Sequence, residues 1–375
     1  MIRATSIPAI GAISLAVSLG SALACADEWQ TAGNLNVPRE YPGLGLLPDG
    51  RVLAVSGHPL GGQSLASAEV YDAETDKWTP TGSLNVPRNG VGHGSLIRLP
   101  SGKFLIAGGG SGSRSVHEVE LYDPVQGTWS MTGAMSVPRC VHTTTQLDDG
   151  SVLVTGGIDW ITEEVRATAE VYDATTGEWA TTGAMNTPRF NHRAVKLHDG
   201  RVMAIGGNSA YPGEQFVVAD AELYDPRSGN WKPTAPMHTP RRSLAAVVLA
   251  DGRVLVAGGA GRLGEAKKQL SVSEVYDPQS EQWTEVAPLR EGRWGPTATL
   301  LADGQVLIVG GAYGSFGSRS SAELFDPQDC TWRDAGKLSQ ARNGHRAITL
   351  SDGRVLIVGG HCLGRYLTSC EIYTP

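Results

Sequence analysis

The sequence predicts an all-β protein made of seven copies of one four-stranded unit, and three regularities carry this prediction. An Asp-Gly pair separates two apolar runs in almost every unit, and it favours a tight hairpin because both residues tolerate a positive φ. A Gly-Gly pair follows the second apolar run. A tryptophan recurs about every 50 residues, as repeat architectures require, at positions 29, 78, 129, 179, 231, 283 and 332.

Each unit contains four strands in a fixed order. The first follows a Pro-Arg pair and ends at the Asp-Gly turn, and the second is a Val- and Leu-rich run such as 254–257. The third contains a Glu-Val-Tyr motif or a close variant, and the fourth contains the repeated tryptophan. These runs are rich in the β-branched and aromatic residues that are typical of strands.

The double glycine, the Tyr-Asp-Pro motif and the following tryptophan together resemble the kelch repeat. The glycine pairs begin at residues 108, 156, 206, 258, 310 and 359, while the first unit has Ser56-Gly57 instead. Kelch repeats fold as β-propellers with one four-stranded blade per repeat. The resemblance therefore implies a seven-bladed kelch β-propeller over residues 27–375.

The two ends of the repeat array predict how the ring closes. The last unit stops at residues 371–375 without a tryptophan strand, whereas residues 28–30 form a tryptophan strand that belongs to no preceding unit. We expect these two segments to pair in the last blade, because this removes an open sheet edge.

Residues 1–26 have the pattern of a secretory signal peptide: one arginine, an apolar run and small residues at the end. Cleavage after Ala24 or Ala26 would release a periplasmic or secreted protein. The alternative is a lipoprotein anchored at Cys25. A transmembrane anchor is disfavoured because the apolar run is short and contains Pro8.

The charge pattern excludes one class of partner. The formal net charge is −7 and the lysines and arginines are scattered, so the chain lacks the basic face that a nucleic-acid-binding protein needs. We expect a monomer without nucleic acid, without a transmembrane segment and without a cofactor.

Two residue types recur once per unit, and we interpret them as structural. One arginine stands at the same position just before the first strand in each of the seven units. One glutamate precedes the apolar pair of the third strand in each unit. Equal numbers predict one buried Arg–Glu pair in each blade. Three histidines lie three residues after their arginine, and we expect a structural role for them too, although their strand is innermost and places them near the channel mouth: His142, His192 and His345.

Function is expected where the units differ. The connections between second and third strands vary most, and they share one face, here called the loop face, with the connections between units. The opposite turn face carries the uniform Asp-Gly and Tyr-Asp-Pro turns. Aromatic and charged side chains of the loop face can stack on sugars or anchor a peptide. The candidate ligand-binding residues are Trp160, Tyr211, Trp294, Tyr313, Arg319, Tyr366, Tyr41, His142, His192 and His345.

Four cysteines remain beyond Cys25. Cys362 and Cys370 flank one short loop of the last unit, and we expect a disulfide between them, as suits an exported protein. Cys140 and Cys330 belong to different units and opposite faces and cannot meet.

The function favoured by the sequence is a binding module for a glycan or protein ligand on the loop face. Catalysis is left open: a propeller isomerase or lyase that uses channel histidines and carboxylates is the main alternative. The last unit is also similar to the closing kelch unit of copper radical oxidases such as galactose oxidase. That resemblance implies a copper held by tyrosines and histidines, and Tyr41 matches one such tyrosine. The cross-linked cysteine, the second tyrosine and the extra domains of that family have no counterpart, so no metal site is predicted.

Overall fold

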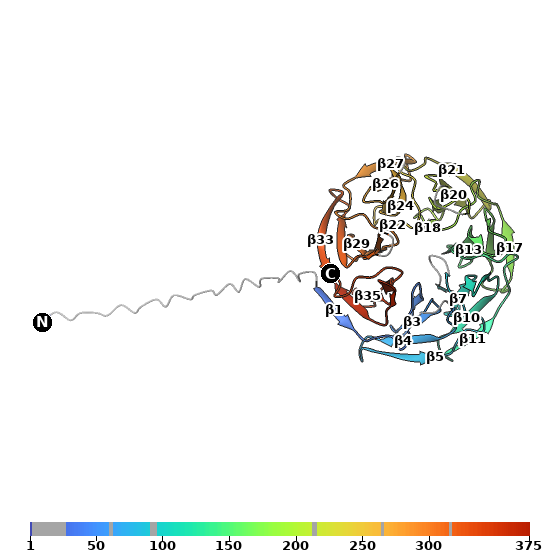
Figure 1. The fold of residues 1–375 in the computed structure, drawn as a ribbon, viewed down its shortest axis with the longest axis horizontal. Coiled ribbons are helices and arrows are strands. Elements are labelled where there is room, and N and C mark those ends of the chain that lie inside the picture. The colour runs from blue at the N-terminus through green and yellow to red at the C-terminus, as the bar shows by residue number, and fades with distance from the viewer. Residues whose placement is uncertain (2–27, 60–62, 91–95, 212–215, 264–265, 315–316) are drawn as a thin grey trace.

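The protein is a ring of seven antiparallel four-stranded sheets around a central axis (Figure 1). The computed structural model describes Met1 and residues 28–59, 63–90, 96–211, 216–263, 266–314 and 317–375. The seven-bladed β-propeller prediction is confirmed. The predicted signal peptide, including Cys25, lies outside the described residues. Within the described part of the chain, no helix is long and apolar enough to span a bilayer.

The four strands of each blade run outward from the axis in sequence order, except in the last blade. The innermost strands are β2 (Gly43–Leu46), β6 (Ile97–Arg98), β12 (Thr143–Gln146), β18 (Arg193–Lys196), β22 (Ala245–Val248), β28 (Thr297–Leu300) and β34 (Arg346–Thr349). The second strands are β3 (Val52–Val55), β7 (Phe104–Ala107), β13 (Val152–Thr155), β19 (Val202–Ile205), β23 (Val254–Ala257), β29 (Val306–Val309) and β35 (Val355–Val358).

The third and fourth strands complete the blades. The third strands are β4 (Ala68–Asp72), β10 (Val119–Asp123), β16 (Ala169–Tyr172), β20 (Ala221–Asp225), β26 (Ser273–Asp277), β32 (Ser321–Asp326) and β38 (Cys370–Thr374). The outermost strands are β5 (Lys77–Thr81), β11 (Thr128–Met131), β17 (Trp179–Thr182), β21 (Asn230–Thr234), β27 (Gln282–Val286), β33 (Thr331–Lys337) and β1 (Glu28–Ala32).

Among the described residues, five blades also carry a small hairpin on the loop face, between their second and third strands. These hairpins are β8 (Gly110–Ser111) with β9 (Arg114–Ser115), β14 (Ile158–Asp159) with β15 (Glu164–Val165), β24 (Ala260–Leu263) with β25 (Ala266–Gln269), β30 (Ala312–Tyr313) with β31 (Gly317–Ser318), and β36 (His361–Cys362) with β37 (Arg365–Tyr366).

The first and last segments of the ring pair as the sequence predicts. Strand β1 is the outermost strand of the last blade and runs antiparallel to β38, with Trp29 opposite Tyr373. The two rings lie 5.1 Å apart, and Trp29 Nε1 donates a hydrogen bond of 2.7 Å to the carbonyl of Ala335 in the preceding blade. In Figure 1 the blue β1 lies beside the red final strands. The N-terminal strand therefore closes the ring.

The core consists of apolar residues packed between adjacent blades. The second strands are buried on both sides, which explains why they read as uninterrupted apolar runs. In every blade an aromatic residue of the third strand contacts the tryptophan of the fourth at about 5 Å between ring centroids. Four of the repeated tryptophans are therefore buried in the core, and Trp29, Trp179 and Trp231 are partly buried and pack against it.

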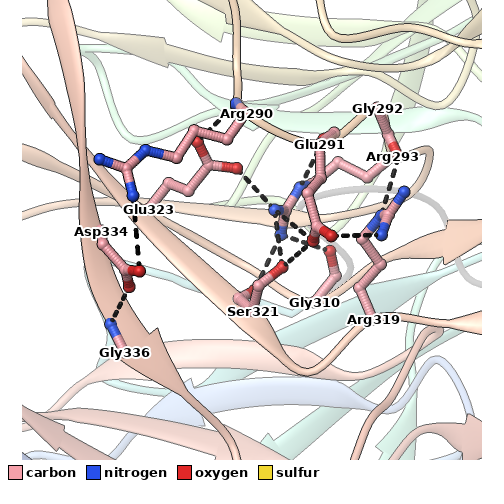
Figure 2. Close-up of polar contacts among 10 residues, drawn as sticks. All are labelled: Arg290, Glu291, Gly292, Arg293, Gly310, Arg319, Ser321, Glu323, Asp334 and Gly336. Carbon is pink, nitrogen blue, oxygen red and sulfur yellow. Dashed lines mark hydrogen bonds and ion pairs between the residues drawn. The ribbon is translucent and has the colours of Figure 1, made fainter.

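The predicted buried Arg–Glu pair is present in all seven blades. Arg293 shows the pattern: its guanidinium donates to Glu323 Oε1 at 2.7 Å, to Ser321 O at 2.8 Å and to Gly310 O at 3.1 Å (Figure 2). Such a pair is stable in the interior because the remaining donors also find partners. The pairs are Arg39–Glu69, Arg88–Glu120, Arg139–Glu170, Arg189–Glu222, Arg241–Glu274, Arg293–Glu323 and Arg342–Glu371.

Candidate functional site

A ring of left-handed residues surrounds the axis at its loop-face end. The residue two positions after each repeat arginine has a φ between 48° and 62°. Backbone bonds link this position from blade to blade, for example Gly295 N–H to Ser243 O at 2.7 Å and Ser243 N–H to Asn191 O at 3.0 Å. These bonds hold even non-glycine residues in a conformation that is otherwise unfavourable. The residues are Tyr41, Gly90, Val141, Asn191, Ser243, Gly295 and Gly344.

Tyr41 is the largest side chain of this ring, and arginines from other blades gather around it. The Arg346 guanidinium lies 5.5 Å from the centre of the Tyr41 ring. Burial, followed by the charge of Glu40, raises the pKa of the Tyr41 hydroxyl to about 12, while Arg346, Arg193 and Arg242 oppose this shift. Residues of the first, fourth, fifth and seventh blades can act on one another in this way because their side chains converge at the axis. Here this group of Tyr41, Arg193, Arg242 and Arg346 is called the axial cluster.

A second polar group joins the first and last blades beside the axial cluster. Glu40 Oε1 lies 3.2 Å from His361 Nδ1, and the two groups form an ion pair when the imidazole is protonated. The Tyr366 hydroxyl lies 3.2 Å from His58 Nδ1, and its ring lies 5.9 Å from the ring of His361. The β36–β37 hairpin is therefore tied to the first blade by charge and aromatic contacts.

The Glu40–His361 contact predicts a pH-dependent tie. The Glu40 carboxylate raises the pKa of His361. The contact therefore stabilises the folded protein fully below the unfolded-state histidine pKa near 6.5, and this stabilisation is lost as the pH rises through the raised folded-state pKa. Glu40→Gln should lower the His361 pKa when the imidazole is titrated by NMR. Glu74→Gln, a change on an exposed turn, is the matched control and should leave the titration unchanged. An equal pKa in wild type and Glu40→Gln would contradict the tie.

The third group is aromatic and lies on the loop face of the third and fourth blades. The Trp160 ring packs edge-on against Tyr211 at 5.7 Å and against Phe190 at 6.3 Å. Trp160 and Tyr211 remain 37% and 43% exposed. Here Trp160, Phe190 and Tyr211 are called the aromatic cluster.

Polar contacts fix the turn that carries Trp160. The Trp160 N–H donates to Ser115 Oγ at 2.9 Å. The carboxylate of Asp159 accepts hydrogen bonds from Ile161 N–H at 3.1 Å and from Thr162 Oγ1 at 3.2 Å. These bonds close the tip of the β14–β15 hairpin, so Trp160 is presented by a braced element rather than by an unsupported loop.

Two further predicted residues are held by internal contacts in the sixth blade. The Arg319 guanidinium lies 4.6 Å from the Tyr313 ring, and it also pairs with Glu291 Oε1 at 2.9 Å and donates to Gly292 O at 2.9 Å. Figure 2 shows Arg319 reaching Glu291 and Gly292. Arg319 therefore supports the exposed Tyr313 and does not offer a free cation. Trp294 is similarly placed beside Arg242, whose guanidinium lies 6.0 Å from the indole.

The three predicted histidines are buried between adjacent blades. His142, His192 and His345 are each at most 1% exposed. Each fills the space beside the first glycine of the preceding blade's Gly-Gly pair, where an added Cβ would lie within 2.8 Å of the imidazole. Burial is the main cause that lowers the pKa of His142 and His345 to about 3 and of His192 well below its usual value. This placement agrees with the structural interpretation, and the buried rings present no exposed surface to a ligand.

The structure does not show the expected disulfide between Cys362 and Cys370, and all four described cysteines are free. Strand register explains the difference. Cys362 lies opposite Arg365 in the β36–β37 hairpin, whereas buried Cys370 lies opposite Val358 in the blade. The two cysteines therefore belong to different sheets, and neither is the strand partner of the other.

The turn face has grooves between blades, but its chemistry repeats. One groove of about 840 Å³ is lined by Asp149, Asp173 and Trp179 among others. The same Asp-Gly-Arg ion pair recurs on four turns, where the arginine follows the aspartate by two residues and pairs with it at 2.7–2.8 Å. Such repeated environments discriminate poorly between ligands.

The structure thus divides the predicted residues among separate places. It brings Trp160 and Tyr211 together, sets Tyr313 with Arg319, and places Tyr41 in the axial cluster and Tyr366 next to it. Sequence reasoning missed the functional candidates Glu40, His58, Phe190, Arg193 and Arg346. One usable signal is the His-Arg pair that ends the spacing Arg-x-x-His-Arg in the fourth and seventh units, at 189–193 and 342–346.

Comparison with known proteins agrees with the repeat seen in the fold. The model of the Kelch motif matches residues 101–136 and 241–290. The chain is a seven-bladed β-propeller that carries Kelch motifs. It is 35% identical to an F-box/kelch-repeat protein of Arabidopsis thaliana over 99 residues. This aligned stretch covers 26% of this chain and 25% of the relative. It is 30% identical to the Kelch-like protein terF of Aspergillus terreus over 104 residues. This stretch covers 27% of this chain and 22% of the relative. The chain spans about a quarter of the length of these curated relatives.

Two solved structures share the kelch propeller fold. A fungal alcohol oxidase of the AA5 family, described in complex with copper, has a TM-score of 0.74 and 17% identity, covering 93% of this chain and 76% of its own. The structure of YjhT has a TM-score of 0.63 and 18% identity, covering 80% of this chain and 98% of its own. At these identities the likeness shows the fold alone.

The residues of this kelch propeller do not fit a copper site. Tyr41 lies in the field of three arginines, which disfavours a bound cation. The histidines lie buried in three different blades, and Cys140 is buried beside the carbonyl of Ile158 at 3.5 Å. Among the described residues no group of three or more His, Cys, Asp or Glu could hold a metal ion.

Proposed function

We propose that this kelch propeller is a binding module that takes a glycan or protein ligand on its loop face. Kelch propellers commonly serve as protein-interaction modules. The loop face differs from blade to blade, whereas the turn face repeats one ion pair. Selective recognition needs placed aromatic and polar groups that occur once, and the loop face supplies them.

The aromatic cluster is the observation that carries this proposal. Trp160 and Tyr211 present edge-packed rings to solvent, and Phe190, which is buried, supports Trp160 from below. Rigid exposed aromatic rings lose little conformational entropy on binding and stack on sugar rings or fill peptide pockets. Exposed Ile161 and Phe216 extend the apolar surface on the same two blades.

The binding test compares two double variants on a glycan array and by titration of the glycans that bind. Trp160→Ala with Tyr211→Ala should weaken binding by about 1–3 kcal/mol per anchor, with little change in the thermal midpoint. Arg201→Ala with Arg253→Ala changes two turn-face residues and should leave the affinity intact.

Three outcomes separate the alternatives. Binding that survives the aromatic variant but not the turn-face variant would contradict the proposal. If the wild-type protein binds no glycan, a glycan ligand is excluded and a protein ligand remains as the proposal. The same two variants then apply to a protein partner, where the aromatic variant should again be the one that loses affinity.

A further inference from the structure

Two arginines of the axial cluster are not explained by the repeat. Arg193 and Arg346 are the first residues of β18 and β34 and stand four positions after their repeat arginine. Four other blades fold with small residues at this position, namely Gly43, Thr143, Ala245 and Thr297. The blade itself therefore does not require an arginine here.

Neither arginine has a counter-ion within the described residues. Arg193 donates from Nε to Leu244 O at 2.6 Å, and Arg346 lies over the Tyr41 ring at 5.5 Å, but no carboxylate forms an ion pair with either. The seven repeat arginines differ sharply, because each has its own glutamate. Glu40, the carboxylate whose charge reaches Arg346, is already paired with His361.

Arg193 and Arg346 each begin an innermost strand at the loop-face end of the axis, and both side chains are partly buried. Burial, and then the positive charge of Arg346, lowers the pKa of Arg193 to about 9, and burial likewise lowers the pKa of Arg346. Both guanidinium groups nevertheless remain protonated at neutral pH. Two partly buried positive charges without a counter-ion raise the free energy of the folded protein. An anion bound between them removes that cost.

We propose that Arg193, Arg346 and Tyr41 form a binding site for a carboxylate group of the ligand at the loop-face end of the axis. The two guanidinium groups offer planar forks that match a carboxylate, and the neutral Tyr41 hydroxyl supplies a further donor. The carboxylate comes from an acidic sugar or from a simple organic acid, and the two sources share this chemistry. The inference rests on the proposed binding function and names the group that the loop face recognises.

Isothermal titration at low salt tests the site with three probes. D-Glucuronate carries a sugar ring and a carboxylate, D-glucose the ring alone, and glycolate a small carboxylate. Wild-type protein should bind glucuronate at least tenfold more tightly than glucose. Arg346→Gln and, separately, Arg193→Gln should each weaken glucuronate binding at least tenfold, whereas Arg201→Gln on the turn face should not. If glucuronate binds more tightly than glycolate, the site is assigned to acidic sugars. If the two bind with equal affinity, it is assigned to simple organic acids.

Two results would overturn the site. One is equal binding of glucuronate and glucose by the wild type, and the other is equal loss in Arg346→Gln and Arg201→Gln. A purely structural role for Arg346 predicts that Arg346→Gln lowers the thermal midpoint without ligand. The binding role predicts an unchanged or higher midpoint, because the like-charge repulsion is gone, together with a smaller upward shift on adding glucuronate.

The same measurements separate this inference from the proposed function. Glycan or protein binding that depends on Trp160 and Tyr211 but not on Arg193 and Arg346 would leave the binding module standing and reject the carboxylate site. Binding that depends on none of these four residues would reject both.

Discussion

A chain that lacks residues 28–32 is expected to lose much of its stability, because β1 supplies the outermost strand of the last blade. The deletion removes five paired residues and exposes the edge of β38. It also removes Trp29, whose indole contacts Tyr373 and donates a hydrogen bond to the neighbouring blade. The single change Trp29→Ala should cost about 3 kcal/mol, at the lower end for tryptophan because the ring is only half-buried.

Urea unfolding measures this effect. Thr31→Ala is a matched control in the same strand, since Thr31 is exposed, and it should change the free energy of unfolding by less than about 0.5 kcal/mol. An unchanged midpoint after deletion of residues 28–32 would mean that the ring does not depend on this strand for closure.

His142→Leu is expected to make the protein markedly more resistant to acid. Burial lowers the pKa of His142 to about 3, so between that value and the unfolded-state pKa near 6.5 the unfolded chain binds a proton that the folded protein does not. Stability therefore falls as the pH falls through this range, by about 1.4 kcal/mol per pH unit for one histidine. Three such histidines together give a loss of about 6 kcal/mol at pH 5.

The fifth blade supplies the model for this substitution. Leu244 occupies the place of the histidine there and packs beside Gly206 in the same way. Neither ring nitrogen of His142 makes a well-aligned hydrogen bond, although backbone groups of Ala107 and Arg139 lie beside the ring. A leucine should therefore change stability little at pH 7.5 and raise it by about 2 kcal/mol at pH 5. His198→Leu changes an exposed histidine and should produce no such gain. Parallel pH profiles for wild type and His142→Leu would contradict the burial effect.

The sequence predicts this fold well because its core chemistry repeats once per blade. The Arg–Glu pairs and the Trp29–Tyr373 contact follow from position in the repeat, since each blade solves the same packing problem. The repeat also shows the loop face as the variable surface, and Trp160 and Tyr211 do meet there.

The sequence analysis is less successful for contacts that do not depend on position in the repeat. The Cys362–Cys370 disulfide is not seen, because a short hairpin, β36–β37, places Cys362 in a sheet separate from the one that holds Cys370. The axial cluster was missed because Tyr41, Arg193 and Arg346 lie far apart in the sequence and in three different blades. The Arg-x-x-His-Arg spacing marks Arg193 and Arg346 as unusual, but their proximity to Tyr41 exists only once the ring has closed.

Hydrogen–deuterium exchange of the protein with and without its bound ligand tests most directly whether recognition lies on the loop face. With the glycan that binds most tightly on the array, or with D-glucuronate, protection should appear in peptides covering 158–166 and 341–346, which carry the Trp160 turn and Arg346. Peptides covering the turns at 148–151 and 198–201 should be unchanged. Protection confined to these turn-face peptides would contradict a binding site on the loop face.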